Sequence, residues 1–275
     1  MAELSDESAA AGASTAEAGA ETGVRASGAP KVVVDGLSKV YESERQRVEA
    51  LSDVRFSVAE GEFVCLVGPS GCGKTTLFRT IAGLEAPTGG EIRLDGDPVT
   101  GPGTDRGMVF QEYGLFPWRT VRGNVAFGLE EQGVEEPDRS RRVDEMLGLV
   151  GLEDFADAYP KELSGGMKQR VGIARALAVD PEILLADEPF GSVDAQTRDM
   201  LHGELLRIWS ETGKTVLFVT HDVEEAVKLS DRVVVMAADP GRVRDVVSVD
   251  IDRPRERTAS AFGEYVDQIR ALIGE

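Results

Sequence analysis

Apolar and polar residues alternate in two stretches near the start of the chain, at 31–41 (KVVVDGLSKVY) and 53–68 (DVRFSVAEGEFVCLVG). This alternation predicts strands, and Glu60-Gly61 predicts a turn that divides the second stretch in two. Further along, apolar runs are each preceded or followed by a segment of helix length. These runs are FVCLVG (63–68), EILLAD (182–187), TVLFVT (215–220) and RVVVMA (232–237). Together they predict an α/β fold with a parallel sheet covered on both faces.

Between about 119 and 162 the apolar residues follow a helical period instead. They are Val143, Met146, Leu147 and Val150, within a charged segment. This spacing predicts a mainly helical subdomain, at about 115–178, inserted into a sheet domain that covers 31–250. At the end of the chain, FGEYVDQIRALI (262–273) predicts an amphipathic helix that packs back on the core, within an extension at 251–275.

The composition is that of a globular chain with a strong acidic excess. The chain has 275 residues, of which 41% are hydrophobic, and its 30 basic and 49 acidic residues give a net charge of −19. Such a charge repels phosphate backbones, so we expect no nucleic-acid partner. With 7 Lys against 23 Arg, the chain resembles proteins of salt-loving organisms, although an acidic protein of another organism is the alternative.

The two ends and the cysteines add little chemistry. Residues 1–30 are rich in Ala, Glu, Ser and Gly, which predicts a disordered acidic tail with no signal peptide. Nowhere do 18 apolar residues run together, so we expect no membrane-spanning segment. Cys65 and Cys72 lie seven apart around a tight turn, and we expect two reduced side chains in a cytosolic protein rather than a disulfide.

The segment GPSGCGKTT (68–76) follows an apolar strand and precedes the helical sequence LFRTIAGL. It matches G-x-x-x-x-G-K-[ST], in which the glycines let backbone N–H groups and a helix N-terminus surround phosphates. We expect Lys74 to reach the β- and γ-phosphates and the Thr75 hydroxyl to bind Mg²⁺. The predicted nucleotide-binding residues of this loop are Gly68, Pro69, Ser70, Gly71, Cys72, Gly73, Lys74, Thr75 and Thr76.

Asp187, Glu188 and His221 follow two other predicted strands, at the sheet edge where α/β proteins bind ligands. Asp187 suits the magnesium shell, Glu188 suits a base that polarises the attacking water, and His221 suits a contact to the γ-phosphate. Taken singly, each would more often be a turn or helix-capping residue. The edge that they share with the 68–76 loop favours the functional interpretation. His202 lies in a helical segment and is expected to be structural.

The stretch LSGGMKQR (163–170) predicts a second anion site. Ser164 suits a helix N-cap, and Gly165 and Gly166 leave the first helical N–H groups bare, before an apolar helical face. The chain therefore offers two helix N-termini to phosphate. A magnesium shell is predicted beside only the first of them.

These motifs resemble the nucleotide-binding subunit of an ABC transporter over roughly residues 31–250. The resemblance implies a P-loop NTPase fold with a mainly parallel core sheet, an antiparallel β subdomain and an inserted helical subdomain. It also implies a head-to-tail homodimer, in which Ser164, Gly165 and Gly166 of one copy cap the ATP held by the other. By the same resemblance Tyr41 stacks on adenine, Gln111 lies near the metal and water, Asp194 is the D-loop acid, and His221 is the switch histidine. The implied metal ligands are Thr75, Gln111 and Asp187.

The segment DGDPVTGPGTDRGMVFQEYGLFPWRTVRGNVAFGL (95–129) and the signature LSGGMKQR resemble one branch of that family, the ATPases of nitrate, sulfonate, taurine and bicarbonate importers. This implies ATP hydrolysis that drives a separate membrane permease, which docks in a groove beside Gln111 and the helical subdomain. The chain would then lie at the cytoplasmic face of the membrane and serve a solute-binding protein indirectly. An importer of another solute is the alternative.

Other classes fit less well. A DNA-repair ATPase of this family would carry long heptads between the P-loop and the signature, and a ribosome-associated factor would carry two cassettes. A small-molecule kinase would not need LSGGMKQR or Glu188, and an exporter usually fuses its own membrane helices. Hydrolysis in the dimer, with Glu188 as base, therefore stays the leading hypothesis.

Overall fold

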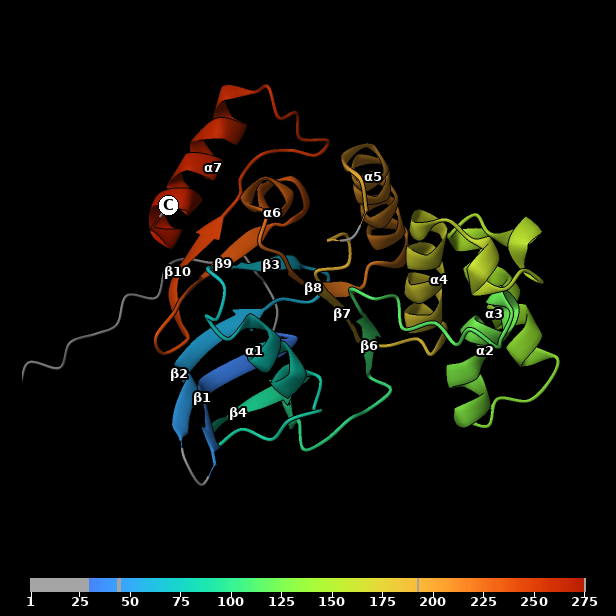
Figure 1. Ribbon diagram of the computed structural model, residues 1–275, viewed down its shortest axis with the longest axis horizontal. Coiled ribbons are helices and arrows are strands. Elements are labelled where there is room, and N and C mark those ends of the chain that lie inside the picture. The colour runs from blue at the N-terminus through green and yellow to red at the C-terminus, as the bar shows by residue number, and fades with distance from the viewer. Residues whose placement is uncertain (1–29, 44–45, 192, 275) are drawn as a thin grey trace, which may run out of the picture.

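The computed structural model describes residues 30–43, 46–191 and 193–274, which form two sheets and a set of surrounding helices (Figure 1). The predicted tail at 1–30 lies outside the described residues except for Pro30. None of the described helices combines the length and the apolar character that a bilayer span requires.

The larger sheet has six strands in the order β10-β9-β3-β8-β7-β6. They are β3 (Phe63–Val67), β6 (Arg106–Val109), β7 (Ile183–Asp187), β8 (Thr215–Val219), β9 (Arg232–Ala237) and β10 (Arg242–Ser248). All neighbouring pairs are parallel except β10 and β9. The four apolar runs of the sequence therefore form the centre of a mainly parallel sheet, which confirms the predicted core. The edge strand β10 carries mostly exposed residues, so no apolar run predicted it.

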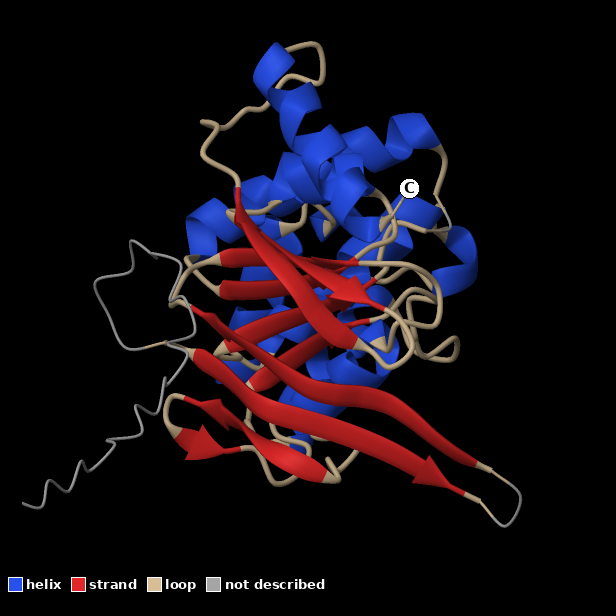
Figure 2. Cartoon of the chain, turned by 90° about the vertical axis from the view of Figure 1, so that its left-hand side faces the viewer, coloured by secondary structure: helices blue, strands red, loops and turns tan. Residues whose placement is uncertain are grey.

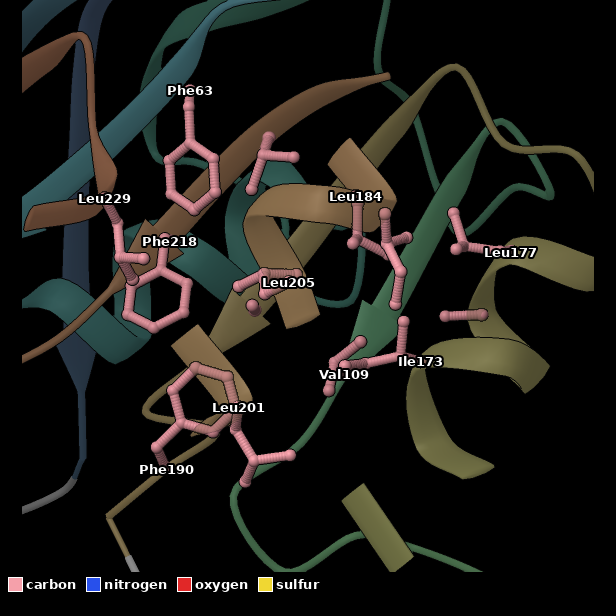
Figure 3. Close-up of a cluster of buried hydrophobic side chains, with 14 of the residues drawn as sticks. Phe63, Val109, Ile173, Leu177, Leu184, Phe190, Leu201, Leu205, Phe218 and Leu229 are labelled. Atoms are coloured by element: carbon pink, nitrogen blue, oxygen red, sulfur yellow. The ribbon is translucent and has the colours of Figure 1, made fainter. Parts of the chain in front are cut away.

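Each central strand is buried on both faces, which explains its uninterrupted apolar sequence. On β3, Phe63, Cys65 and Val67 belong to one core cluster, and Val64 and Leu66 belong to another on the opposite face. Figure 3 shows part of the first cluster, where Phe63 and Phe218 lie close together; their ring centroids are 5.9 Å apart.

The smaller sheet is antiparallel, with the strand order β2-β1-β4-β5. Its strands are β1 (Val32–Glu42), β2 (Arg47–Val58), β4 (Gly89–Leu94) and β5 (Asp97–Pro98). In Figure 2 it lies on the side of the central sheet away from most helices. It packs with α1 (Lys74–Ile81) against Val64 and Leu66. That face of the central sheet is thus covered by a sheet as well as a helix, and the smaller sheet is the antiparallel β subdomain that the family resemblance implies. Strand β2 begins at Arg47, whereas the alternating pattern predicted a start at 53. Its first residues are exposed, so no apolar pattern marked them as part of the strand.

The remaining helices cover the other face of the central sheet and its β6 edge. They are α2 (Val121–Glu131), α3 (Asp138–Leu149), α4 (Gly165–Ala178), α5 (Ala195–Thr212), α6 (Val223–Leu229) and α7 (Ser260–Ile273), with short 3₁₀ turns at Glu153–Phe155 and Pro160–Glu162. Helices α2, α3 and α4 pack on one another beyond β6, as Figure 1 shows. Helix α7 buries Phe262, Val266 and Ile269 against the first core cluster, as its apolar spacing predicts.

Candidate functional site

Four neighbouring parallel strands, β3, β8, β7 and β6, end at the same edge of the central sheet. The loop that begins at Gly68 follows β3, and His221 lies just beyond β8. Asp187 ends β7, and one residue separates Gln111 from the end of β6. Because the carboxyl ends of adjacent parallel strands meet, residues from four distant parts of the sequence surround one site.

The 68–76 loop turns tightly into α1, and its glycines make the turn possible. Gly73 has φ 87° and lies at the N-cap of the helix. A Cβ at this position would lie 2.8 Å from the Ala50 carbonyl oxygen, so only glycine fits. The Lys74 ammonium lies across the loop and donates to the carbonyl oxygens of Gly68 at 2.7 Å and Pro69 at 3.2 Å. Its charge is therefore held at the centre of the loop, where phosphates would lie.

Glu188 and His221 face each other across the ends of β7 and β8. Glu188 Oε2 lies 3.2 Å from His221 Nδ1. The Glu188 backbone has φ 43°, a conformation that costs a non-glycine residue free energy and that is concentrated at functional sites. Its N–H donates to the Val219 carbonyl at 3.0 Å, which fixes the strained residue to the neighbouring strand.

Asp187, next to Glu188, occupies a more enclosed position. Burial raises the pKa of the Asp187 carboxyl, and the negative charge of Glu188 raises it further. The positive charges of Arg79 and Lys74 partly oppose this shift. A carboxylate held in such a place gains from a cation beside it, which agrees with the predicted role at a metal.

Gln111 lies against the loop that follows Glu188. A Cβ built on Gly191 would come within 3.0 Å of Gln111 Nε2, so the amide touches this loop closely. The Gln111 side chain is otherwise exposed. The structure thus brings Gln111 into the same group as Asp187 and Glu188.

Tyr41, on β1, is joined to the P-loop helix through its hydroxyl. The phenol donates to a Glu85 carboxylate oxygen and lies 3.4 Å from Thr76 Oγ1. The Lys39 ammonium lies 5.0 Å from the ring centroid. Partial burial and the Glu85 carboxylate raise the pKa of Tyr41. The ring is 40% exposed, so it offers a surface beside the loop, while Glu85 holds it in place.

The signature stretch begins α4 as predicted, and its neighbours come from the same chain. Ser164 is the N-cap, and its hydroxyl accepts a hydrogen bond from the Met167 N–H at 3.2 Å. A Cβ on Gly165 would lie 3.0 Å from the Tyr113 hydroxyl, and one on Gly166 would lie 3.1 Å from Thr197 Cγ2. Side chains of the same chain therefore come close to both glycines.

Asp194 caps α5, next to the signature. Its carboxylate accepts hydrogen bonds from the Thr197 N–H at 3.0 Å and the Thr197 hydroxyl at 2.7 Å. The hydrogen bonds from the Thr197 hydroxyl and N–H lower the pKa of Asp194. The predicted D-loop acid thus has a capping role within the chain.

The residues predicted for Mg²⁺ offer oxygen donors, which this hard cation prefers. Thr75 contributes an exposed hydroxyl at the start of α1, Gln111 an amide oxygen, and Asp187 a carboxylate. In the described parts of the chain no group of three or more His, Cys, Asp and Glu residues could hold a metal by itself. The donor set therefore fits an ion that takes its remaining ligands from phosphate and water.

Sequence reasoning missed the residues that hold these groups in place. Glu85 fixes Tyr41, and Thr220 and Glu225 lie beneath His221. None of the three stands in a motif that spacing alone reveals. His202 is fully buried, as its structural assignment requires, but it is hydrogen-bonded to Glu225.

Comparison with known proteins agrees with this geometry. A model of the family described as "ABC transporter" matches residues 51–191. An uncharacterized ABC transporter ATP-binding protein of Methanocaldococcus jannaschii is 56% identical over 88% of this chain and 91% of its own length. The nitrate import ATP-binding protein NrtD of Synechocystis sp. is 48% identical over 87% of this chain and 94% of its own. A solved dimeric ATP-binding cassette, in a post-hydrolysis state bound to ADP and Pi, superposes with a TM-score of 0.70 at 34% identity, covering 80% of this chain and all of the other.

Proposed function

Since this chain belongs to the ABC transporter family, we propose that it binds and hydrolyses ATP to drive a membrane importer of small anions of the nitrate, sulfonate or taurine type. The solute class rests on the Synechocystis nitrate import relative and on the resemblance of residues 95–129 to that branch. An importer of another solute remains the second candidate. Two copies would pair around ATP, as in the dimeric cassette, and attach to a permease at the cytoplasmic membrane face.

The observation that carries this proposal is the approach of Glu188 to His221 at the edge that also holds the P-loop. Glu188 would accept a proton from the water that attacks the γ-phosphate. His221 faces Glu188 through Nδ1, which leaves Nε2 for a γ-phosphate oxygen. Lys74 and the loop N–H groups would bind the β- and γ-phosphates, with Tyr41 against the adenine.

Thr75, Asp187 and Gln111 would hold Mg²⁺, which neutralises phosphate charge when it is bound. Across the dimer, Ser164, Gly165 and Gly166 of the second copy would direct the N-terminus of α4 at the same phosphates. Hydrolysis would cleave the bond to the γ-phosphate and so break the bridge between the copies. The copies would then separate, and the permease, docked beside Gln111 and the helical subdomain, would respond.

Glu188→Gln tests the assigned base. The amide keeps the size of the side chain but cannot accept the proton, so we expect ATP turnover to fall at least about 100-fold. ATP-dependent dimerisation, measured by light scattering, should persist because the phosphate contacts are unchanged. Glu224→Gln, on the exposed face of α6, is the matched control and should keep the unmodified rate. Full turnover by Glu188→Gln would contradict the assignment.

Identifying the transported solute requires an assay with the permease. Reconstituted with the permease and binding protein, the ATPase rate should rise with nitrate, taurine or an alkyl sulfonate. A rise with an unrelated solute and none with these anions would favour the second candidate.

A further inference from the structure

A chain of polar side chains lies in the core directly beneath His221. Thr220 directly follows β8, Glu225 lies on α6, and His202 lies on α5. These three side chains are almost fully excluded from solvent, with exposed fractions of 2%, 5% and 0%. Burying a polar group destabilises a core unless the group is hydrogen-bonded, so the hydrogen-bond partners of these three side chains have to be identified.

The Glu225 carboxylate joins the other two side chains. One of its oxygens accepts from the Thr220 hydroxyl, and the other lies 2.6 Å from His202 Nε2. The Thr220 hydroxyl in turn accepts from the Asp222 N–H at 3.0 Å, across His221. The residues on both sides of His221 are therefore fixed by one hydroxyl, whose orientation Glu225 sets.

Backbone contacts strengthen this arrangement. The Thr220 N–H donates to the Leu66 carbonyl on β3 at 3.2 Å, and the Asp222 carboxylate accepts from the Glu224 and Glu225 N–H groups. Only the His221 side chain projects from this fixed loop into the site, where it is 67% exposed and meets Glu188. A shift of the loop would therefore move the imidazole away from Glu188.

His202 also contacts the segment that follows Glu188. The His202 ring packs edge-on against Phe190, with centroids 5.3 Å apart. Figure 3 shows Phe190 beside Leu201, the neighbour of His202 on α5. Helix α5 begins at the cap Asp194. His202 thus lies on the helix that follows Asp194 and contacts the segment after Glu188. Through Glu225 it is also linked to the loop of His221.

The network is not the arrangement that stability alone would favour. His202 Nδ1 is buried, and among the described residues it has no hydrogen-bond partner, with Asp199 Oδ1 3.7 Å away. A buried nitrogen without a partner costs free energy that an apolar side chain would avoid.

We propose that Thr220, Glu225 and His202 are positioning residues that hold His221 against Glu188 and link its position to α5. This inference rests on the proposed ATPase function. It concerns side chains that do not touch nucleotide, so their effect should pass through His221 alone.

Thr220→Val tests the proposal because valine keeps the shape and removes the hydroxyl. In steady-state ATPase assays of the full chain we expect kcat to fall about 10-fold and KM for ATP to change less than about twofold, since misplacing a catalytic group slows chemistry without weakening binding. Ser230→Ala is the matched control. It removes a fully buried hydroxyl at the end of α6, the helix that carries Glu225, and kcat should stay within about twofold. An unchanged kcat in Thr220→Val would overturn the proposal.

The double variant with His221→Ala separates positioning from a general structural effect. If Thr220 acts through His221, adding Thr220→Val to His221→Ala should lower kcat no further. Multiplication of the two single effects would refute the mechanism. If His221→Ala itself keeps the unmodified kcat, the proposed function of His221 fails instead, so the two failures are distinguishable.

His202 provides a second route that does not depend on the folding of Thr220→Val. His202→Gln keeps an N–H near the Nε2 position and should retain kcat, whereas His202→Leu removes the donor and should lower kcat about 10-fold, again with little change in KM. Equal kcat values for the two variants would count against the network.

Discussion

At the residue scale, Asp187 and Glu188 show how one strand end places two adjacent carboxylates in different surroundings. Asp187 ends a buried strand and lies between Lys74 and Glu188, whereas Glu188 turns out of the strand with φ 43° and meets His221. Burial disfavours the charge on Asp187, and only a cation at the site would offset that cost fully. The Glu188 side chain is 26% exposed, so water can reach it.

Replacing Asp187 by asparagine should therefore stabilise the nucleotide-free protein. The folded-state pKa of Asp187 is raised above the unfolded value, so its ionisation weakens folding as the pH rises through that window and above it. At pH 7 we expect Asp187→Asn to raise the Tm by about 2 °C, and the difference should vanish below about pH 3, where the carboxyl is largely neutral in both states. Mg²⁺-dependent ATPase activity should be lost.

Thermal unfolding followed by circular dichroism between about pH 3 and pH 8 measures this difference. Asp267→Asn, on the exposed face of α7, makes the same chemical change away from the site and should leave the Tm unaltered. A lower Tm for Asp187→Asn at pH 7 would show that the carboxylate stabilises the fold.

The residues proposed to contact phosphate stand in motifs that the sequence reveals, because their spacing reflects backbone geometry. A tight loop needs glycine at fixed intervals, and the ends of apolar strands point to the binding edge. Thr220, Glu225 and His202 could not be predicted in this way. They lie on three elements and meet only through tertiary packing, so no local pattern brings them together.

At the element scale, apolar patterning succeeds where a strand or helix is strongly buried. The runs of β3, β7, β8 and β9 were identifiable for that reason. Strands β4 and β5 were not among the expected strands: β4 alternates exposed and buried residues over only six positions, and β5 is two exposed residues long. Strand β4 pairs with β1, which is distant in sequence, and a local pattern does not report such a contact. Strand β5 pairs only with β4.

Helix α7 offers a direct test of packing at this scale. Ile269 is fully buried against the core, so Ile269→Ala should lower the free energy of unfolding by about 2 to 5 kcal/mol through lost burial and the cavity left behind. Urea unfolding measures the change. Gln268→Ala, on the exposed side of the same helix, should stay within about 0.5 kcal/mol. Equal effects of the two changes would mean that α7 does not rest on the core in solution.

At the scale of the whole molecule, one chain presents two helix N-termini that are predicted to bind phosphate and that do not lie at the same site. The loop before α1 lies beside Asp187, Glu188 and His221, whereas the nearest side chains to Gly165 and Gly166 belong to Tyr113, Val193, Thr197 and Leu201. The N-terminus of α4, at the exposed Ser164, is therefore presented outward. A second copy can supply the phosphate that it would meet, and ATP would then act as a shared ligand between chains.

If the site needs both copies, the ATPase rate per chain should depend on protein concentration. Where dimers are scarce their fraction grows in proportion to total chain, so a tenfold dilution should lower the rate per chain by about tenfold. Two copies joined by a flexible linker should keep a constant rate per chain over the same range, because pairing is then intramolecular. Lys74→Ala, assayed in parallel, reports any contaminating ATPase. A rate per chain that is independent of dilution in the unlinked protein would mean that one copy completes the site alone, and the outward-facing end of α4 would then need another partner.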